Sequence, residues 1–139
     1  MKSRYEPLVK LKKKALDKAE QALMGANNEV TLSDTALDNA YSQLSFLTSP
    51  KNGSIGELVQ AQMIAQAQHR EIESCRLRVD RARINQNRAR EVFRFSRIEF
   101  EKFNYLEVQE IEAMVAKVKH EEAKMLDEIG TMTYKKVWH

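Results

Sequence analysis

The sequence predicts an all-α fold: a two-helix antiparallel coiled-coil hairpin with a long C-terminal helical overhang. Three observations predict it. The 139 residues include only four Gly and two Pro, apolar residues recur at steps of seven, and a cluster of turn residues interrupts this repeat about a third of the way along the chain. We therefore expect a single coiled-coil domain over residues 1–139, with a helix at about 5–48, a loop at about 49–54 and a second helix at about 55–136.

The first helix begins with a capping pattern and carries one apolar seam. Ser3 and Glu6 have the spacing of a capping box, and Pro7 lies in the first turn, where a missing backbone N–H costs least. The seam consists of two series with a period of seven, the second offset from the first by three. They are Val9, Leu16, Leu23, Val30, Leu37 and Leu44, then Lys12, Ala19, Ala26, Ser33, Ala40 and Leu47, of which only Lys12 is charged.

The second helix opens on another capping pattern, Ser54 and Glu57. No Gly or Pro lies between Gly56 and Gly130, so one helix about 80 residues long can form, reaching roughly 120 Å. Its seam is Leu58, Ala65, Ile72, Val79, Gln86, Phe93 and Phe100, with Ala61, Gln68, Cys75, Ala82, Ala89, Ser96 and Phe103. The lone cysteine, Cys75, should therefore be buried and behave as a small hydrophobe.

The short loop makes the two helices antiparallel neighbours. A register in which paired residue numbers sum to about 105 sets large side chains against small ones and places Pro7 near Ile98. Everything from about Phe100 onward then lacks an intramolecular partner, and the heptad phase shifts there. The shifted series is Ile111, Val118, Met125 and Met132. We expect an apolar overhang that needs a partner; the alternative is a fold-back at 103–105 that makes a three-helix bundle.

Nothing in the sequence predicts an enzyme. It has no Gly-rich phosphate loop, no Cys-x-x-Cys pair, no His-Glu-x-x-His and no Ser-His-Asp set with a pocket. The histidines His69, His120 and His139 are far apart. Although His120, Glu121 and Glu122 are metal-ligand types, neighbouring residues point about 100° apart on a helix and cannot converge on one ion. We expect no catalytic residue, no cofactor and no metal.

Charge divides the chain into basic and acidic parts. Residues 1–19 carry seven basic and two acidic side chains, 70–97 carry nine Arg and four acids, and 99–128 carry nine acids and four Lys. Nucleic acid is a partner that the arginines could indicate, but aromatic residues are not interleaved with them and the acidic part would repel phosphates. We expect no nucleic-acid binding. No apolar run approaches the ~20 residues that span a bilayer, and the start lacks a signal peptide, which favours the cytoplasm.

Two surfaces of the second helix predict protein contacts. The basic docking stripe occupies one e position in four successive heptads: Arg76, Arg83, Arg90 and Arg97. Glu20 and Asp34 in the first helix can neutralise only part of it, so it is either a site for an acidic partner or a solvated face. The outer face, which is polar in an isolated hairpin, instead carries Met63, Leu77, Ile84, Ile98 and Tyr105, with Phe95 nearby.

Three stretches resemble the FliJ family of the flagellar type III export apparatus. They are the opening Arg4-Tyr5-x-Pro7-Leu8-x-x-Leu11, the Gln68-His69 step after the loop, and above all the ending Lys124-Met125-Leu126-Asp127-Glu128-Ile129-Gly130-Thr131-Met132-Thr133-Tyr134. The likeness covers most of the chain. Because coiled coils attract false matches, the repeats of Leu and Ala add little to it and the ending adds most.

The resemblance implies a non-enzymatic central stalk, similar in shape to the stalk of rotary ATPases. Members of that family insert their joined termini into the ring of the hexameric flagellar export ATPase, contact the cytoplasmic domain of the export gate protein, and exchange export chaperones. Carried over to this sequence, the gate contact would be Tyr41, Leu44, Leu58, Ala65 and His69, and the ATPase contact would be Leu8, Leu11, Met125, Ile129, Met132 and Tyr134. Gln62 departs from the family, where an apolar residue is more typical.

The same resemblance implies peripheral association with the membrane-embedded export apparatus through protein partners, without direct membrane insertion, and a role in flagellar motility and chemotaxis. Two other interpretations stay open. One is the equivalent stalk protein of a virulence type III secretion system. The other is a structural coiled coil that associates with itself through the segment from Phe100 to Met132.

Overall fold

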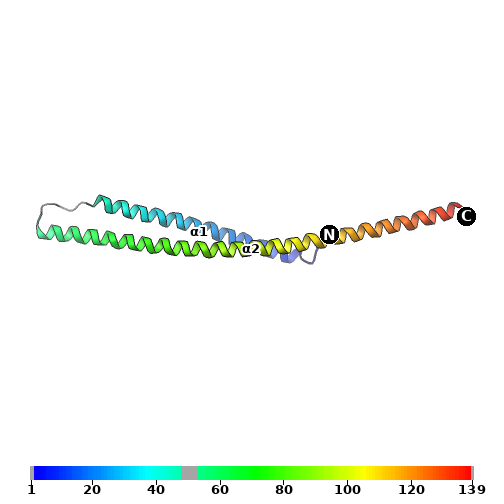
Figure 1. Cartoon of the computed structure of the whole chain (residues 1–139), viewed down its shortest axis with the longest axis horizontal. Helices are drawn as coiled ribbons and strands as arrows, with labels where there is room; N and C mark the ends of the chain where they lie inside the picture. The colour runs from blue at the N-terminus through cyan, green and yellow to red at the C-terminus, as the bar shows by residue number, and fades with distance from the viewer. Residues whose placement is uncertain (1, 48–52, 139) are drawn as a thin grey trace. The chain divides into compact units, whose positions relative to one another are not determined.

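A computed structural model describes the backbone of residues 2–47 and 53–138 and the side chains up to residue 135. Within these ranges the chain forms two helices, α1 (Glu6–Phe46) and α2 (Ile55–Trp138), and no strand (Figure 1). The helices pack against each other as an all-α hairpin, which confirms the predicted fold class. Because α2 runs through residues 103–105 without a break, the three-helix alternative is wrong. Residues 49–52 of the predicted loop lie outside the described residues.

The chain falls into two compact units, each containing part of both helices. Unit 1 consists of Met1–Leu16 and Ser96–His139, and unit 2 of Asp17–Phe95. The single domain expected over residues 1–139 stays a prediction.

In unit 2 the core is the predicted seam. Ser33 is fully buried, and Val79 and Ala82 are only 4% and 3% exposed. The Ser33 hydroxyl donates to the Val30 carbonyl at 3.0 Å, so its burial leaves no unmade hydrogen bond. Small residues at these positions let the two backbones approach while larger neighbours fill the space between them.

Cys75 lies in this core, as predicted, at 8% exposure. It forms a cluster with Ala40 and Ile72, against which Leu37 and Leu44 pack. Burial, followed by the charge of Glu71 and a hydrogen bond to it, raises the pKa of the Cys75 thiol. The thiol therefore stays protonated near neutral pH and acts as a packing group.

The two glutamines of the unit 2 seam are hydrogen-bonded across the two helices. Gln68 donates from Nε2 to the Ala40 carbonyl at 2.8 Å, and Gln86 donates to the Asn27 side-chain oxygen at 2.8 Å. These bonds compensate the loss of water at half-buried amides. The seam opens towards the loop, where Leu47 and Leu58 are exposed although they were predicted to be buried.

In unit 1 the N-terminal segment lies along α2 as far as Glu110 (Figure 1). Ser3 donates from Oγ to Glu110 at 3.1 Å, and the Arg4 guanidinium lies 3.4 Å from the same carboxylate. Lys12 forms an ion pair with Glu99 at 3.5 Å, so the one charged seam residue of α1 is neutralised. We call the three-residue contact of Ser3 and Arg4 with Glu110 the N-terminal clasp.

The two predicted capping boxes differ in outcome. Ser54 caps α2, because its Oγ accepts the backbone N–H of Glu57 at 3.2 Å. In α1, Ser3 Oγ instead accepts the N–H of Tyr5 at 3.1 Å, and the Glu6 carboxylate pairs with Lys10 at 3.3 Å. The clasp explains the difference, since Ser3 also donates to Glu110 and so faces the seam.

The register predicted from the sequence is wrong by about one heptad. It places Pro7 beside Ile98 and would set Cys75 against Val30. In unit 1, however, the clasp carries the start of the chain to Glu110. In unit 2, the cluster that contains Cys75 includes Ala40, and Ala36, Leu37 and Leu44 pack against it, whereas Val30 does not.

The intramolecular partner of α2 therefore ends later than predicted. The original seam phase continues beyond Phe100 through half-buried Glu107, Glu110 and Met114. Every residue from Val115 to the last described side chain, Lys135, is exposed. The overhang accordingly begins near Val115, and we use this name for residues 115–135.

Candidate partner-binding surfaces

The overhang presents one continuous apolar side. Within unit 1, the orange and red part of α2 has no other segment of the unit beside it (Figure 1). Its large apolar side chains recur at alternating steps of three and four, which places them along one side of a helix. The exposed members on the overhang are Val115, Val118, Met125, Ile129 and Met132, with Leu126 and Tyr134 beside them, and Val108 continues the series before the overhang.

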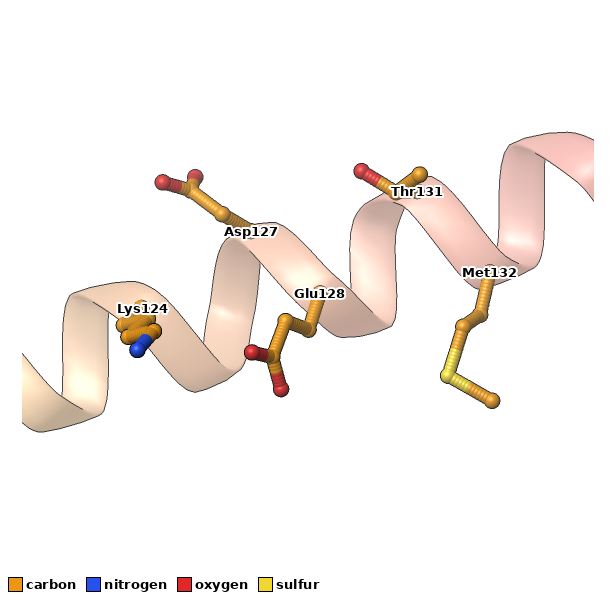
Figure 2. A pocket seen from close by; sticks show the side chains of 5 residues that line it. All are labelled: Lys124, Asp127, Glu128, Thr131 and Met132. Atoms are coloured by element: carbon orange, nitrogen blue, oxygen red, sulfur yellow. The ribbon is translucent and has the colours of Figure 1, made fainter.

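Four of the six predicted ATPase-contact residues lie on the overhang: Met125, Ile129, Met132 and Tyr134. Met132 is 70% exposed. Figure 2 shows it in a shallow recess formed by five residues of this one helix, where Asp127 and Thr131 point to one side and Glu128 and Met132 to the other. A recess with walls from one helix does not enclose a small ligand, whereas an exposed apolar helix side is the kind of surface that helix-in-groove recognition uses.

The other two predicted ATPase-contact residues, Leu8 and Leu11, are exposed on α1 in the same unit. A groove lined by Val9, Lys10, Lys13, Lys14 and Phe100 lies in this part of the unit. The Lys13 ammonium lies 5.4 Å from the centre of the Phe100 ring. Leu8 and Leu11 thus belong to the part of unit 1 in which α1 packs against α2, and the other four residues belong to the overhang.

The predicted gate-contact residues lie in unit 2, and the structure divides them into two kinds. Leu44 and Ala65 are half-buried, and Leu44 packs against the Cys75 cluster. Tyr41, Leu58 and His69 are exposed. The Arg76 guanidinium donates to the Tyr41 phenol oxygen, from Nε at 2.9 Å and also from a terminal nitrogen. That contact fixes the orientation of the Tyr41 ring, whose face lies beside the guanidinium.

Sequence reasoning missed much of the apolar surface at this end of unit 2. Phe46 and Ile55 are each 82% exposed, and Val59 and Ile64 are exposed on α2 beside Met63 of the predicted outer face. The signal was present, since these residues occupy positions outside the seam next to the predicted turn. Together with Leu58 they form what we call the tip patch.

The basic docking stripe is partly neutralised within the molecule. In unit 2, Arg83 pairs with Asp34 at 3.6 Å, and Arg76 lies 3.8 Å from Glu73 besides its bond to Tyr41. In unit 1, Arg97 lies 3.8 Å from Glu101. These ion pairs are largely exposed and contribute little to stability.

Two other arginines of α2 differ in whether they form an ion pair. Arg90, also in the stripe, has no ion pair within the part of the chain that the structure describes. The shortest cross-helix ion pair, Arg78 with Glu29 at 2.8 Å, lies outside the predicted stripe. The hydrogen bond to Glu29 and its charge raise the pKa of Arg78 further above its usual value, so the guanidinium remains charged.

The outer face of α2 is exposed and apolar in both units. In unit 2 it carries Met63, Leu77, Ile84 and Phe95, and in unit 1 it carries Ile98 and Tyr105. These side chains point away from α1, because they occupy the helix positions opposite the seam. They therefore stay available for contacts with other proteins.

Comparison with known families identifies the chain. A sequence model of the family described as Flagellar FliJ protein matches residues 1–137. The chain belongs to the FliJ family. No curated protein and no solved structure gives a match. Membership of the FliJ family makes the chain a stalk component of the flagellar export apparatus, active in flagellar biosynthesis and type III protein export.

This identity fits the surfaces described above. The FliJ family is a structural part of the apparatus and not a known enzyme family, and its members interact with other export-apparatus proteins. Among residues 2–47 and 53–138, neither helix has a stretch apolar enough to cross a bilayer. In the same ranges, no three His, Cys, Asp or Glu side chains are grouped so that they could hold a metal ion.

Proposed function

We propose that this FliJ-family chain is the central stalk that joins the export ATPase ring to the export gate. The observation that carries the proposal is the overhang, a lone helix whose apolar side meets no other part of its own unit. Such a side is unfavourable in water and is stabilised when a ring encloses it. The ATPase contact would use Met125, Ile129, Met132 and Tyr134, with Leu8 and Leu11 at the mouth of the ring.

The gate contact would lie in unit 2, near the end of α1 and the start of α2. Tyr41, Leu58 and His69 are accessible there, and Leu44 and Ala65 support them from the seam. The tip patch extends this surface by several exposed apolar side chains. A binding surface with an aromatic anchor and a polar surround is typical of protein interfaces.

Export chaperones would use the sides of the hairpin. The outer face of α2 in unit 2 offers apolar side chains, and Arg90 offers a charge without an ion pair among the described residues. An acidic segment of a chaperone would complement this part of the basic docking stripe, and weak exposed ion pairs would let it exchange quickly.

A truncation separates the two proposed contacts. Ending the chain after Met114 removes the overhang but keeps the clasp, because Ser3 and Arg4 meet Glu110. We expect this variant to lose binding to the purified export ATPase and to keep binding to the cytoplasmic domain of the gate protein, both measured by pull-down. Retained ATPase binding would refute the role of the overhang.

A second variant tests the proposed gate contact in unit 2. Replacing Tyr41, Leu58 and His69 with alanine leaves the overhang untouched, so ATPase binding should persist while gate binding is lost. If both variants lose both partners, the two surfaces are not separate and the stalk proposal is wrong.

A further inference from the structure

The apolar side of α2 from Val108 to Met132, most of it on the overhang, has the spacing of a coiled-coil seam with one charged member. Steps of three and four lead along α2 through eight positions, all on one side of the helix. They are Val108, Ile111, Val115, Val118, Glu122, Met125, Ile129 and Met132. Seven of these eight are apolar, and Glu122 is the exception. It lies inside the series and not at its edge.

The surroundings of Glu122 are apolar on both sides along the helix. It lines a shallow groove together with Met125, Leu126 and Ile129, and Val118 precedes it by one turn. No ion pair or hydrogen bond of Glu122 is found within the described part of the chain, and Lys119, three residues earlier, does not pair with it. Its carboxylate therefore depends on water for solvation.

Any protein that covers this seam removes that water. A buried carboxylate without a partner is strongly unfavourable, whereas a cation held opposite it offsets much of the desolvation cost. Since the seam positions contain no Lys or Arg, a second copy of the overhang, in either direction, would set Glu122 against an apolar residue or another Glu122. A second copy is therefore a poor occupant.

We propose that Glu122 is the specificity-determining residue of the overhang. It selects a protein groove that has apolar walls and a Lys or Arg at the matching height, and it prevents the overhang from pairing with a second copy of itself. Polar residues at single seam positions set register and partner choice in coiled coils at some cost in stability. The choice of the export ATPase as the protein that holds this groove rests on the function proposed above.

The first experiment tests the exclusion of a second copy and needs no partner. Glu122→Leu in the full-length chain completes the apolar seam, so we expect a dimer in sedimentation equilibrium at micromolar concentrations at which the unmodified protein is a monomer. Asp127→Leu is the matched control, because it also removes one carboxylate but lies about 140° round the helix from Glu122. A monomeric Glu122→Leu variant, or a dimer of the unmodified protein, would overturn the proposal.

The second experiment tests the basic residue in the groove. Affinity for the purified export ATPase is measured by calorimetry for Glu122→Lys and for Asp127→Lys, which make the same change of charge. We expect about a hundredfold weaker binding for the first variant and a change of only a few fold for the second. Equal losses would show a general effect of net charge and would refute the specific role of Glu122.

The two experiments separate this inference from the stalk function. If the unmodified protein does not bind the export ATPase, the stalk proposal fails, while the sedimentation result still decides whether Glu122 excludes a second copy. If the unmodified protein binds and Glu122→Lys binds equally well, the stalk proposal survives and this inference is wrong.

Discussion

At the scale of single residues, the seam contains one acid whose buried oxygen finds no donor. Glu107 continues the heptad phase of α2 in unit 1, and its Oε2 is buried without a hydrogen bond among the residues described. The neighbouring Glu110 takes both partners that the clasp supplies, Ser3 and Arg4. An unsatisfied buried oxygen lowers stability, so Glu107 destabilises the packing of α1 against α2 in unit 1.

Replacing Glu107 with leucine should therefore stabilise the folded chain. The change removes an unsatisfied carboxylate from the seam and adds apolar area, for an expected gain of ~1 kcal/mol in the free energy of unfolding. Thermal melting followed by circular dichroism measures it. Glu112→Leu, at an exposed position nearby, is the control and should change stability by less than half as much. A lower melting temperature for the Glu107 variant would contradict this assignment.

Cys75 gives a second prediction at this scale. Its pKa is raised in the fold, so the contribution of the buried thiol to stability is fully present below the thiol's unfolded pKa and is lost as pH rises through the higher folded value. Alkylation by iodoacetamide near neutral pH should be slow in the native protein and should become fast in urea. An equal rate in both conditions would show that Cys75 is accessible in the native state.

At the scale of the helices, the sequence determined the seam but not its register. All predicted seam positions except Leu47 and Leu58 are buried or half-buried. Sliding one helix by seven residues, however, brings the same kinds of position face to face again. Large also meets small in the observed register, where Leu37 packs against the cluster of Ala40, Ile72 and Cys75. The heptad pattern alone therefore could not choose between the two.

The native cysteine offers a direct test of the register. Leu37→Cys adds a thiol that packs against the cluster containing Cys75, so mild oxidation should form an intramolecular disulfide. Val30→Cys, the partner of Cys75 in the register predicted from the sequence, should not form one. Mass spectrometry of tryptic peptides reads the outcome. A disulfide in the Val30 variant alone would restore the original register.

At the scale of the whole molecule, the sequence predicted that α2 has a packed part and an unpacked overhang. It did not predict the residue at which the overhang begins. The change of heptad phase and the apolar series after Phe100 indicated an overhang. The overhang begins near Val115, later than predicted, because the clasp holds the N-terminal segment against α2 as far as Glu110. The sequence did not predict this boundary, since a seven-residue repeat gives no sign of contacts that Ser3 and Arg4 make outside it. Glu122 is a different case, because its place in the shifted series follows from the sequence, whereas its lack of an ion pair among the described residues required the structure.

This contrast predicts the pattern of amide hydrogen exchange. A lone helix is only marginally stable in water, whereas a packed one is held by its apolar face. Amides of residues 115–135 should exchange far faster than those of 72–82 in the free protein. Addition of the export ATPase should slow exchange in residues 115–135 by at least tenfold. Unchanged exchange there with saturating ATPase would contradict enclosure of the overhang.

The N-terminal clasp also has a consequence for anyone who labels this protein. Because Ser3 is held at Glu110, a fluorescent domain fused ahead of it would lie beside α2 just before the overhang begins. Such a fusion would limit how far the overhang can enter the proposed ATPase ring, although every proposed contact residue would be unchanged.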